Sequence, residues 1–113
     1  MRISMARGDI HWERFLINDP NGTGSDLEFD NIYFTVKKSK NDRLFYFQKS
    51  IKDGTIEKLG PGDYQFKIEP KDTNKMAYGE YYSDIQVGYK NLLKETFPID
   101  FILTGEATWA ENE

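Results

Sequence analysis

Apolar and polar residues alternate with a period of two along most of this chain, and Gly, Pro, Asn and Asp interrupt the alternation at short intervals. The clearest run spans residues 31–38, where Ile32, Phe34 and Val36 share one parity. Successive side chains of a β-strand point to opposite faces of a sheet, so such a run predicts a strand with one buried face. The regular interruptions predict short strands joined by turns, without a long helix.

The same pattern predicts further strands at residues 3–5, 10–17, 44–51, 62–69, 79–89 and 94–103. The first of these is expected at a sheet edge. In the second, the apolar parity shifts between Trp12 and Phe15, which predicts a β-bulge or a bend that restores one apolar face. In the last, Phe97 is expected to face inward, and Pro98 falls on the outward parity, which a sheet edge or bulge tolerates.

Only one short helical segment is expected. Residues 70–76 can form at most a single turn, because Pro70 fixes its own φ and no apolar stripe follows it. About seven to eight short strands in 113 residues therefore predict one domain, residues 1–113, with an all-β fold. The favoured architecture is an antiparallel, immunoglobulin-like β-sandwich, and a small barrel is the alternative.

Composition excludes several classes of protein. The chain has no cysteine, so it has no disulfide framework and no thiolate nucleophile or metal ligand. A formal net charge of -4 does not fit a general nucleic-acid-binding protein, which needs a basic surface. The basic run at residues 37–43 is predicted to be a solvated hairpin tip. No apolar run is long enough to span a bilayer, and the first twelve residues lack the apolar region of a signal peptide, so neither a membrane partner nor secretion by a signal peptide is expected.

Residues suited to catalysis or metal binding form no convincing set. The single histidine, His11, lies in a predicted strand, and no serine has a nucleophile-elbow sequence. Asp19, Asn21 and Asp26 could supply oxygen ligands from the loop at residues 18–26, but this composition is that of an ordinary turn. We therefore expect no enzyme activity, cofactor, metal or small-molecule substrate.

The tripeptide Arg7-Gly8-Asp9 matches the short sequence that integrins bind on exposed loops. A purely structural interpretation is preferred here. Gly8 permits a sharp turn between two short strands, and Asp9 is expected to bond back to the chain.

Parity divides the aromatic residues at the start of the last third of the chain between the two faces of one predicted strand. Tyr81 falls on the inward face of its strand, whereas Tyr82 and Asp84 fall on the outward face. Gly79, two residues before Tyr81, follows the single helical turn, as at the entry to strand F of immunoglobulin-type domains. There a tyrosine hydroxyl bonds back to the backbone. Gly79 and Tyr81 are therefore predicted to form a structural corner. The predicted interaction residues are Tyr33, Tyr78, Tyr82 and Trp109.

Four pieces of the sequence, in this order, resemble small structural proteins of tailed bacteriophages and of prophages of Gram-positive bacteria. They are RGD at 7–9, DNIYFTV at 30–36, GDYQFKIEPKDT at 62–73 and YGEYYSDIQV at 78–87. The set is also similar to the immunoglobulin-like N-terminal domain of phage baseplate upper proteins. The resemblance implies a virion, tail or baseplate component without catalytic activity. The chain departs from this pattern in two ways: Lys37-Lys38 follows the second piece, and the receptor-binding domain that follows in baseplate proteins is lacking. The chain could therefore be a free-standing subunit or an adaptor.

We therefore expect a non-enzymatic phage or prophage structural protein that acts by protein–protein assembly. Its partners would be other phage structural proteins and copies of itself, in the virion or, before assembly, in the bacterial host cytoplasm. The segment 3–5 and the strand that holds Pro98 are the edges expected to be available for assembly. The alternative is a carbohydrate- or cell-surface-binding module that uses Tyr33, Tyr82 and Trp109, because aromatic faces stack on sugar rings.

Overall fold

The computed structural model describes residues 2–17, 31–60, 62–89 and 93–105. Its elements are β1 (Arg2–Ala6), β2 (His11–Leu16), β3 (Asn31–Lys37), β4 (Phe47–Ser50), β5 (Ile56–Gly60), β6 (Asp63–Ile68), α1 (Pro70–Thr73), β7 (Gly79–Tyr89) and β8 (Leu93–Thr104). The short helix lies inside the segment predicted to hold one helical turn. The described part of the chain is therefore all-β apart from this turn, as the alternation predicts.

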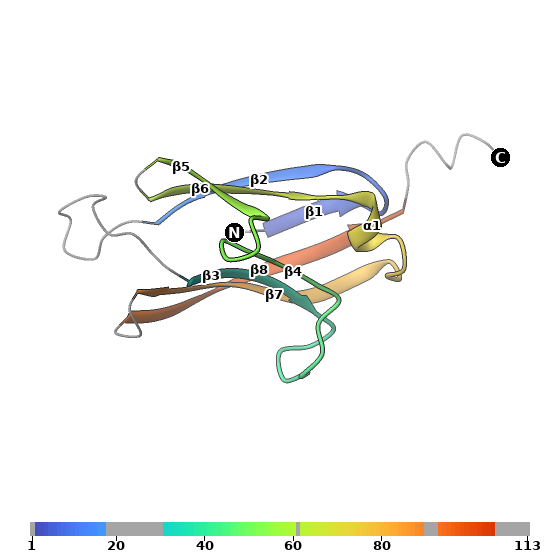
Figure 1. Ribbon diagram of the computed structural model, residues 1–113. Coiled ribbons are helices and arrows are strands. Elements are labelled where there is room, and N and C mark those ends of the chain that lie inside the picture. The colour runs from blue at the N-terminus through green and yellow to red at the C-terminus, as the bar shows by residue number, and fades with distance from the viewer. Residues whose placement is uncertain (1, 18–30, 61, 90–92, 106–113) are drawn as a thin grey trace.

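The strands form two sheets that face each other as a sandwich (Figure 1). The larger sheet has the strand order β1-β8-β7-β3-β4, and the smaller sheet has the order β2-β6-β5. β1 runs parallel to β8, whereas the other pairs are antiparallel. Because β1 and β2 belong to different sheets, the turn at residues 7–9 carries the chain from one layer to the other.

Apolar side chains from both sheets meet between the layers. Phe34 of β3 and Phe66 of β6 stack across this interface with ring centroids 4.4 Å apart. The inward parity predicted for β3 and β6 is confirmed, since their alternate side chains are buried. The buried core residues are Ile3, Met5, Phe15, Ile32, Phe34, Val36, Phe47, Ile56, Tyr64, Phe66, Ile68, Met76, Ile85, Val87, Ile99, Phe101 and Leu103.

β1 lies at one edge of the larger sheet, as predicted for residues 3–5. Its register places Arg2 opposite Asp100 and Ala6 opposite Thr104, so residues 93–99 of β8 extend beyond β1. Pro98 lies in this extension. Because proline has no N–H to donate to a neighbouring strand, this position agrees with the predicted edge.

β2 differs from its prediction. It pairs with β6 in one continuous antiparallel register, from His11 opposite Ile68 to Leu16 opposite Asp63. The predicted bulge is therefore wrong, and the strand keeps a single parity that buries Phe15 and turns Trp12 outward. The Nζ of Lys67 lies 5.4 Å from the centre of the Trp12 ring, a cation–π contact that offsets part of the exposure.

β5 is a strand that the sequence pattern did not predict. Only Ile56 of its side chains is buried, and the pairing with β6 shifts register between Lys58 and Gly60. Because almost all side chains of this edge strand are exposed, its sequence lacks the alternation of apolar and polar residues by which a strand is predicted.

α1 ties the connection after β6 to the opposite sheet. Pro70 occupies the first helical position, and the Asp72 carboxylate accepts a hydrogen bond from the backbone N–H of Glu69 at 2.8 Å, as part of a capping box. The same carboxylate accepts a hydrogen bond from the Nζ of Lys49, which belongs to β4 of the larger sheet, at 2.7 Å. A polar contact therefore joins the two layers beside the apolar core.

Candidate functional site

Tyr33 and Tyr82 both lie on the outer face of the larger sheet, but in different rows. Tyr33 of β3 is opposite Gln86 of β7, and Tyr82 is opposite Lys37. Four residues of β3 separate the two rows, which corresponds to about 13 Å along the strand. The two predicted interaction residues therefore do not share one compact site.

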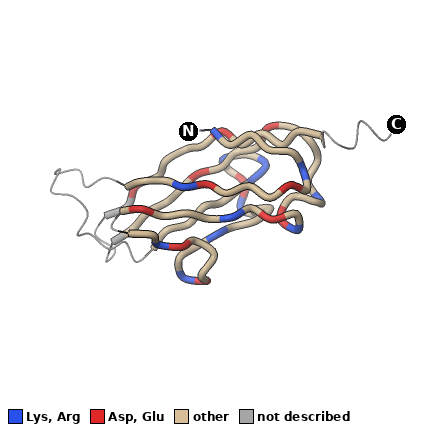
Figure 2. The backbone as a smooth tube through the Cα atoms, turned by 90° about the horizontal axis from the view of Figure 1, so that it is seen from above, with Lys and Arg blue, Asp and Glu red and all other residues tan. Residues whose placement is uncertain are grey.

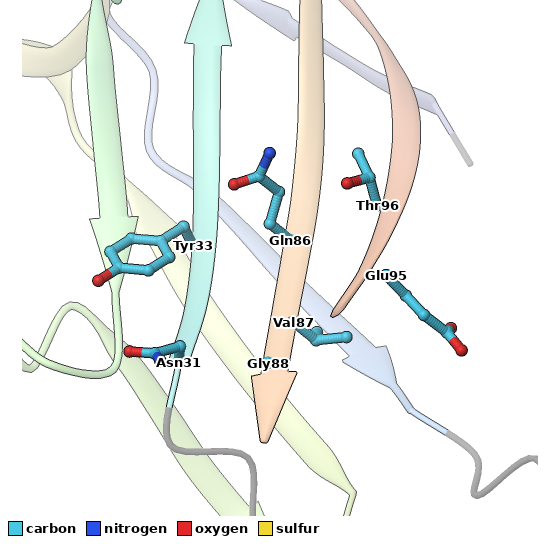
Figure 3. Close-up of a pocket in the computed structure, with 7 residues that line it drawn as sticks. All are labelled: Asn31, Tyr33, Gln86, Val87, Gly88, Glu95 and Thr96. Atoms are coloured by element: carbon cyan, nitrogen blue, oxygen red, sulfur yellow. The ribbon is translucent and has the colours of Figure 1, made fainter. Parts of the chain in front are cut away.

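A shallow hollow of about 340 Å³ surrounds Tyr33 at the end of this face. Its lining residues are Asn31, Tyr33, Gln86, Val87, Gly88, Glu95 and Thr96, which come from β3, β7 and β8 (Figure 3). The ring of Tyr33 points away from Gln86, and Glu95 points to the opposite side of the hollow (Figure 3). Because the polar groups do not converge, the hollow lacks the arrangement that general acid–base catalysis requires.

Tyr82 is engaged within its own strand. Its hydroxyl donates a hydrogen bond to Oδ2 of Asp84 at 2.9 Å. Burial, with a smaller effect of the Asp84 carboxylate, raises the pKa of Tyr82 to about 12. Asp84 keeps its predicted outward parity but is buried, because Tyr82 binds it and Thr35 and Pro98 flank it in the same row. The outward parity of Asp84 therefore does not expose it, and the Tyr82 hydroxyl already has a partner within the chain.

Tyr78 is also held by a neighbour. The guanidinium of Arg7 lies 4.4 Å from the centre of the Tyr78 ring and donates a hydrogen bond to its hydroxyl at 3.0 Å. Gly8 has a φ of 86°, and its N–H donates to Oγ1 of the buried Thr73 at 3.0 Å. The N–H of Asp9 donates to the carbonyl of Ala6, which confirms the predicted turn. The tripeptide is thus anchored to the α1 region at Arg7 and Gly8.

Tyr81 has contacts on both sides of its ring. Its hydroxyl donates a hydrogen bond to the carbonyl of Ala77 at 2.5 Å, four residues upstream. The ring packs edge-on against Tyr46 and Phe101, with centroids 5.2 and 6.3 Å away. Gly79 has a φ of 143°, in the region that favours glycine. The corner role of this pair stays a prediction, with a stability test below. Trp109 lies outside the described residues.

An apolar groove opens between the two sheets where β8 extends beyond β1. We call it the β8 groove; it has a volume of about 290 Å³ and is lined by Phe15, Leu16, Ile17, Ile85, Phe97, Pro98 and Ile99. Leu16 is 68% exposed and Phe97 is 43% exposed, although Phe97 has the inward parity of a core residue. The expected burial of Phe97 is therefore incomplete, because within the described residues no strand pairs with this part of β8 on the side away from β7.

A second apolar surface lies on the connection between β3 and β4, which projects from the sandwich (Figure 1). We call it the hairpin surface; it is lined by Lys38, Asp42, Arg43, Leu44, Phe45 and Tyr46. Leu44 is 85% exposed and Phe45 is 50% exposed. β4 begins at Phe47, so the strand predicted at 44–51 starts three residues too early. The signal that could have identified this surface is three consecutive large apolar residues directly after a basic run.

Trp12 is the third exposed apolar feature, and it was missed because the parity of its strand was misread. It is 56% exposed and contributes to a hollow of about 260 Å³ together with Glu57, Gln65 and Lys67. Figure 2 shows that acidic and basic residues are interspersed along the strands. The surroundings of Trp12 therefore combine an aromatic face with polar groups of both signs.

Chemistry-bearing groups do not cluster in the described part of the chain. The Nε2 of His11 lies 2.9 Å from Oε1 of Glu13, a pair within a single strand. Among the described residues, no group of three or more His, Asp or Glu side chains is placed to hold a metal ion. The proposed ligand loop at 18–26 lies outside these residues. No helix of the described segments has the length and apolar character needed to cross a membrane.

No protein-family model matches the chain, and no curated protein matches it in sequence.

Proposed function

We propose that this chain is a non-enzymatic structural protein of the phage or prophage tail or baseplate class, and that it acts by protein–protein assembly. In this proposal the sandwich is immunoglobulin-like, and its partners are other copies and other structural proteins of the same particle. The collinear sequence resemblance supports the class. The β8 groove is the single structural observation that supports the assembly mechanism.

The groove combines two features that favour addition of a strand from a neighbouring copy. Among the described residues, no strand pairs with residues 93–99 of β8 on the side away from β7, which leaves that backbone edge open to an extended segment. Leu16 and Phe97 flank the same opening and would lose their exposure to water when a strand is added. Pro98 cannot donate a hydrogen bond, so the pairing would rely on the residues around it.

Sedimentation velocity over a wide range of protein concentration tests this proposal. The wild-type chain is expected to form oligomers, and Phe97→Lys is expected to stay monomeric because it places a charge in the groove. Thr96→Lys is the matched control, because Thr96 belongs to the same strand but lines the outer-face hollow. A wild-type chain that remains monomeric at every concentration and with candidate partner proteins would refute the assembly mechanism.

The alternative function is binding of carbohydrate or of a cell surface. The observation that favours it concerns Trp12, which is not among the residues predicted for this function from the sequence. Tyr82 is engaged by Asp84, but Trp12 presents an exposed indole beside Glu57, Gln65 and Lys67. A glycan array probed with wild type and Trp12→Ala tests this function. Leu59→Ala removes another exposed apolar side chain and should leave any glycan binding unchanged.

A further inference from the structure

The hairpin surface is preorganised for contact. The N–H of Ser39 donates to the Asp42 carboxylate at 3.2 Å, and the N–H of Asp42 donates to the Ser39 carbonyl at 3.1 Å, which closes the tip. At the base, the N–H of Tyr46 donates to the Val36 carbonyl at 2.8 Å, and its ring packs against Tyr81. Leu44 and Phe45 are therefore exposed on a turn whose conformation is fixed by hydrogen bonds.

The charge around this surface selects the kind of partner. Residues 37–46 contain the four cations Lys37, Lys38, Lys40 and Arg43 and the single carboxylate Asp42, a net charge of +3 on a chain whose formal net charge is -4. An exposed leucine and phenylalanine surrounded by cations fit a segment that combines a large apolar side chain with carboxylates.

The chain itself contains such a segment. Residues 105–113, with the sequence GEATWAENE, hold three glutamates, no lysine or arginine, and Trp109 at the centre. No other stretch of nine residues joins a tryptophan to three carboxylates without a basic residue. The chemistry is complementary to the hairpin surface in both charge and apolar character.

The topology of the larger sheet allows residues 105–113 to reach the hairpin surface. β3 and β8 are both antiparallel to β7, so they run in the same direction and reach the same end of the sheet. Lys37, Tyr82 and Asp100 lie in one row across these strands. The hairpin surface joins β3 to β4, so the lateral step from β8 is two to three strand spacings, about 10 to 15 Å. Trp109 follows Thr104 by five residues, which span up to about 17 Å when extended.

We propose that residues 105–113 dock on the hairpin surface of the same chain, with Trp109 against Leu44 and Phe45 and the glutamates beside the cations. A segment of the same chain is present at a high effective concentration, so it competes well against a segment from another copy. This contact is independent of the proposed assembly function, because the β8 groove lies on the β1 side of β8, whereas the hairpin surface follows β3 on the other side of β7. Either can fail without the other.

Tryptophan fluorescence tests the contact directly. The chain has two tryptophans, so Trp12→Phe leaves Trp109 as the only one. In this background Trp109 emission is expected to be blue-shifted and quenched several-fold less efficiently by acrylamide than in the variant that also carries Leu44→Ser and Phe45→Ser. Lys38→Glu with Arg43→Glu should have a similar effect without changing an apolar residue. High salt should weaken the protection of Trp109 in part, because it screens the charge contribution.

Matched controls and concentration dependence make the result decisive. Leu59→Ser and Lys52→Glu alter an exposed leucine and an exposed lysine elsewhere, and should leave Trp109 emission unchanged. Circular dichroism establishes that each variant is folded. Protection that is independent of protein concentration supports docking within one chain. Trp109 that is fully accessible to quencher, or protection that appears only as concentration rises, overturns the proposal.

Discussion

The Nζ of Lys49 lies 2.7 Å from the carboxylate of Asp72, and both side chains are nearly buried. Lys49 belongs to β4 of the larger sheet, whereas Asp72 belongs to the helix that follows β6 of the smaller sheet. The pair therefore links the two layers through a buried ion pair beside the apolar core.

Removal of one member of this pair should destabilise the fold strongly. Lys49→Met leaves the Asp72 carboxylate without its cation in a mostly buried position, and we expect a loss of about 3 kcal/mol in the free energy of unfolding. Adding Asp72→Asn should restore part of the loss, because the amide oxygen can still accept from Glu69. Urea denaturation of the double-mutant cycle measures this coupling. Additive losses would show that the two side chains do not stabilise each other.

The Tyr81 hydroxyl is expected to contribute through its bond to Ala77. Tyr81→Phe keeps the ring contacts with Tyr46 and Phe101 but removes the donor, so we expect a loss of about 1 kcal/mol in urea denaturation. Tyr33→Phe removes the same atom on the outer face and serves as the control. An unchanged midpoint for Tyr81→Phe would remove the corner role assigned to this residue.

Tyr82 should make stability depend on alkaline pH. Its pKa is raised from the ordinary 10.0 to about 12, so the folded chain keeps the phenol proton at pH values where the unfolded chain has lost it. This contribution is complete below pH about 10 and is lost as the pH rises to about 12. Unfolding of wild type and Tyr82→Phe should be compared across this window. The phenylalanine variant should lose less stability, and parallel curves would contradict the assignment.

Substitution by alanine should destabilise the fold at Gly62 but not at Gly60. Gly62 has a φ of 69°, and a Cβ there would lie 2.6 Å from the carbonyl oxygen of Ile17, whereas no atom lies within 4 Å of a Cβ at Gly60. Gly62→Ala should therefore lower the unfolding free energy by about 2 kcal/mol. Gly60→Ala should be nearly neutral or slightly stabilising in the same thermal or urea measurement. Equal effects would mean that neither the backbone angle nor the contact with Ile17 matters.

Sequence patterns predicted the interior strands of this fold better than its edges. In β6 the fully buried residues alternate on one face, and β3 follows the same pattern apart from Thr35, so Phe34 and Phe66 could be placed in the core. Trp12 was misplaced because a regular strand can expose an aromatic ring when a lysine covers it. The exposure of Phe97 depends on where the pairing of β1 with β8 begins, and no local pattern encodes the extent of a neighbouring strand.

The candidate sites were harder to predict because they depend on strand register and on partners that are distant in the sequence. Parity placed Tyr33 and Tyr82 on one face, but their rows depend on the register of β3 against β7. The engagement of Tyr78 by Arg7 joins residues that are 71 positions apart. Side-chain partners of this kind come from topology, which a single sequence does not display.

The pairing of β1 with β8 has a consequence for how the chain acquires its structure. The hydroxyl of Thr104 donates to the carbonyl of Met5, two residues 99 positions apart. During synthesis, β1 must therefore wait until β8 has been made before its partner strand exists. Contacts of such long sequence separation form late and slowly. We therefore expect the larger sheet to be completed only after β8 is released, and the apolar side chains of Ile3 and Met5 to stay exposed until then.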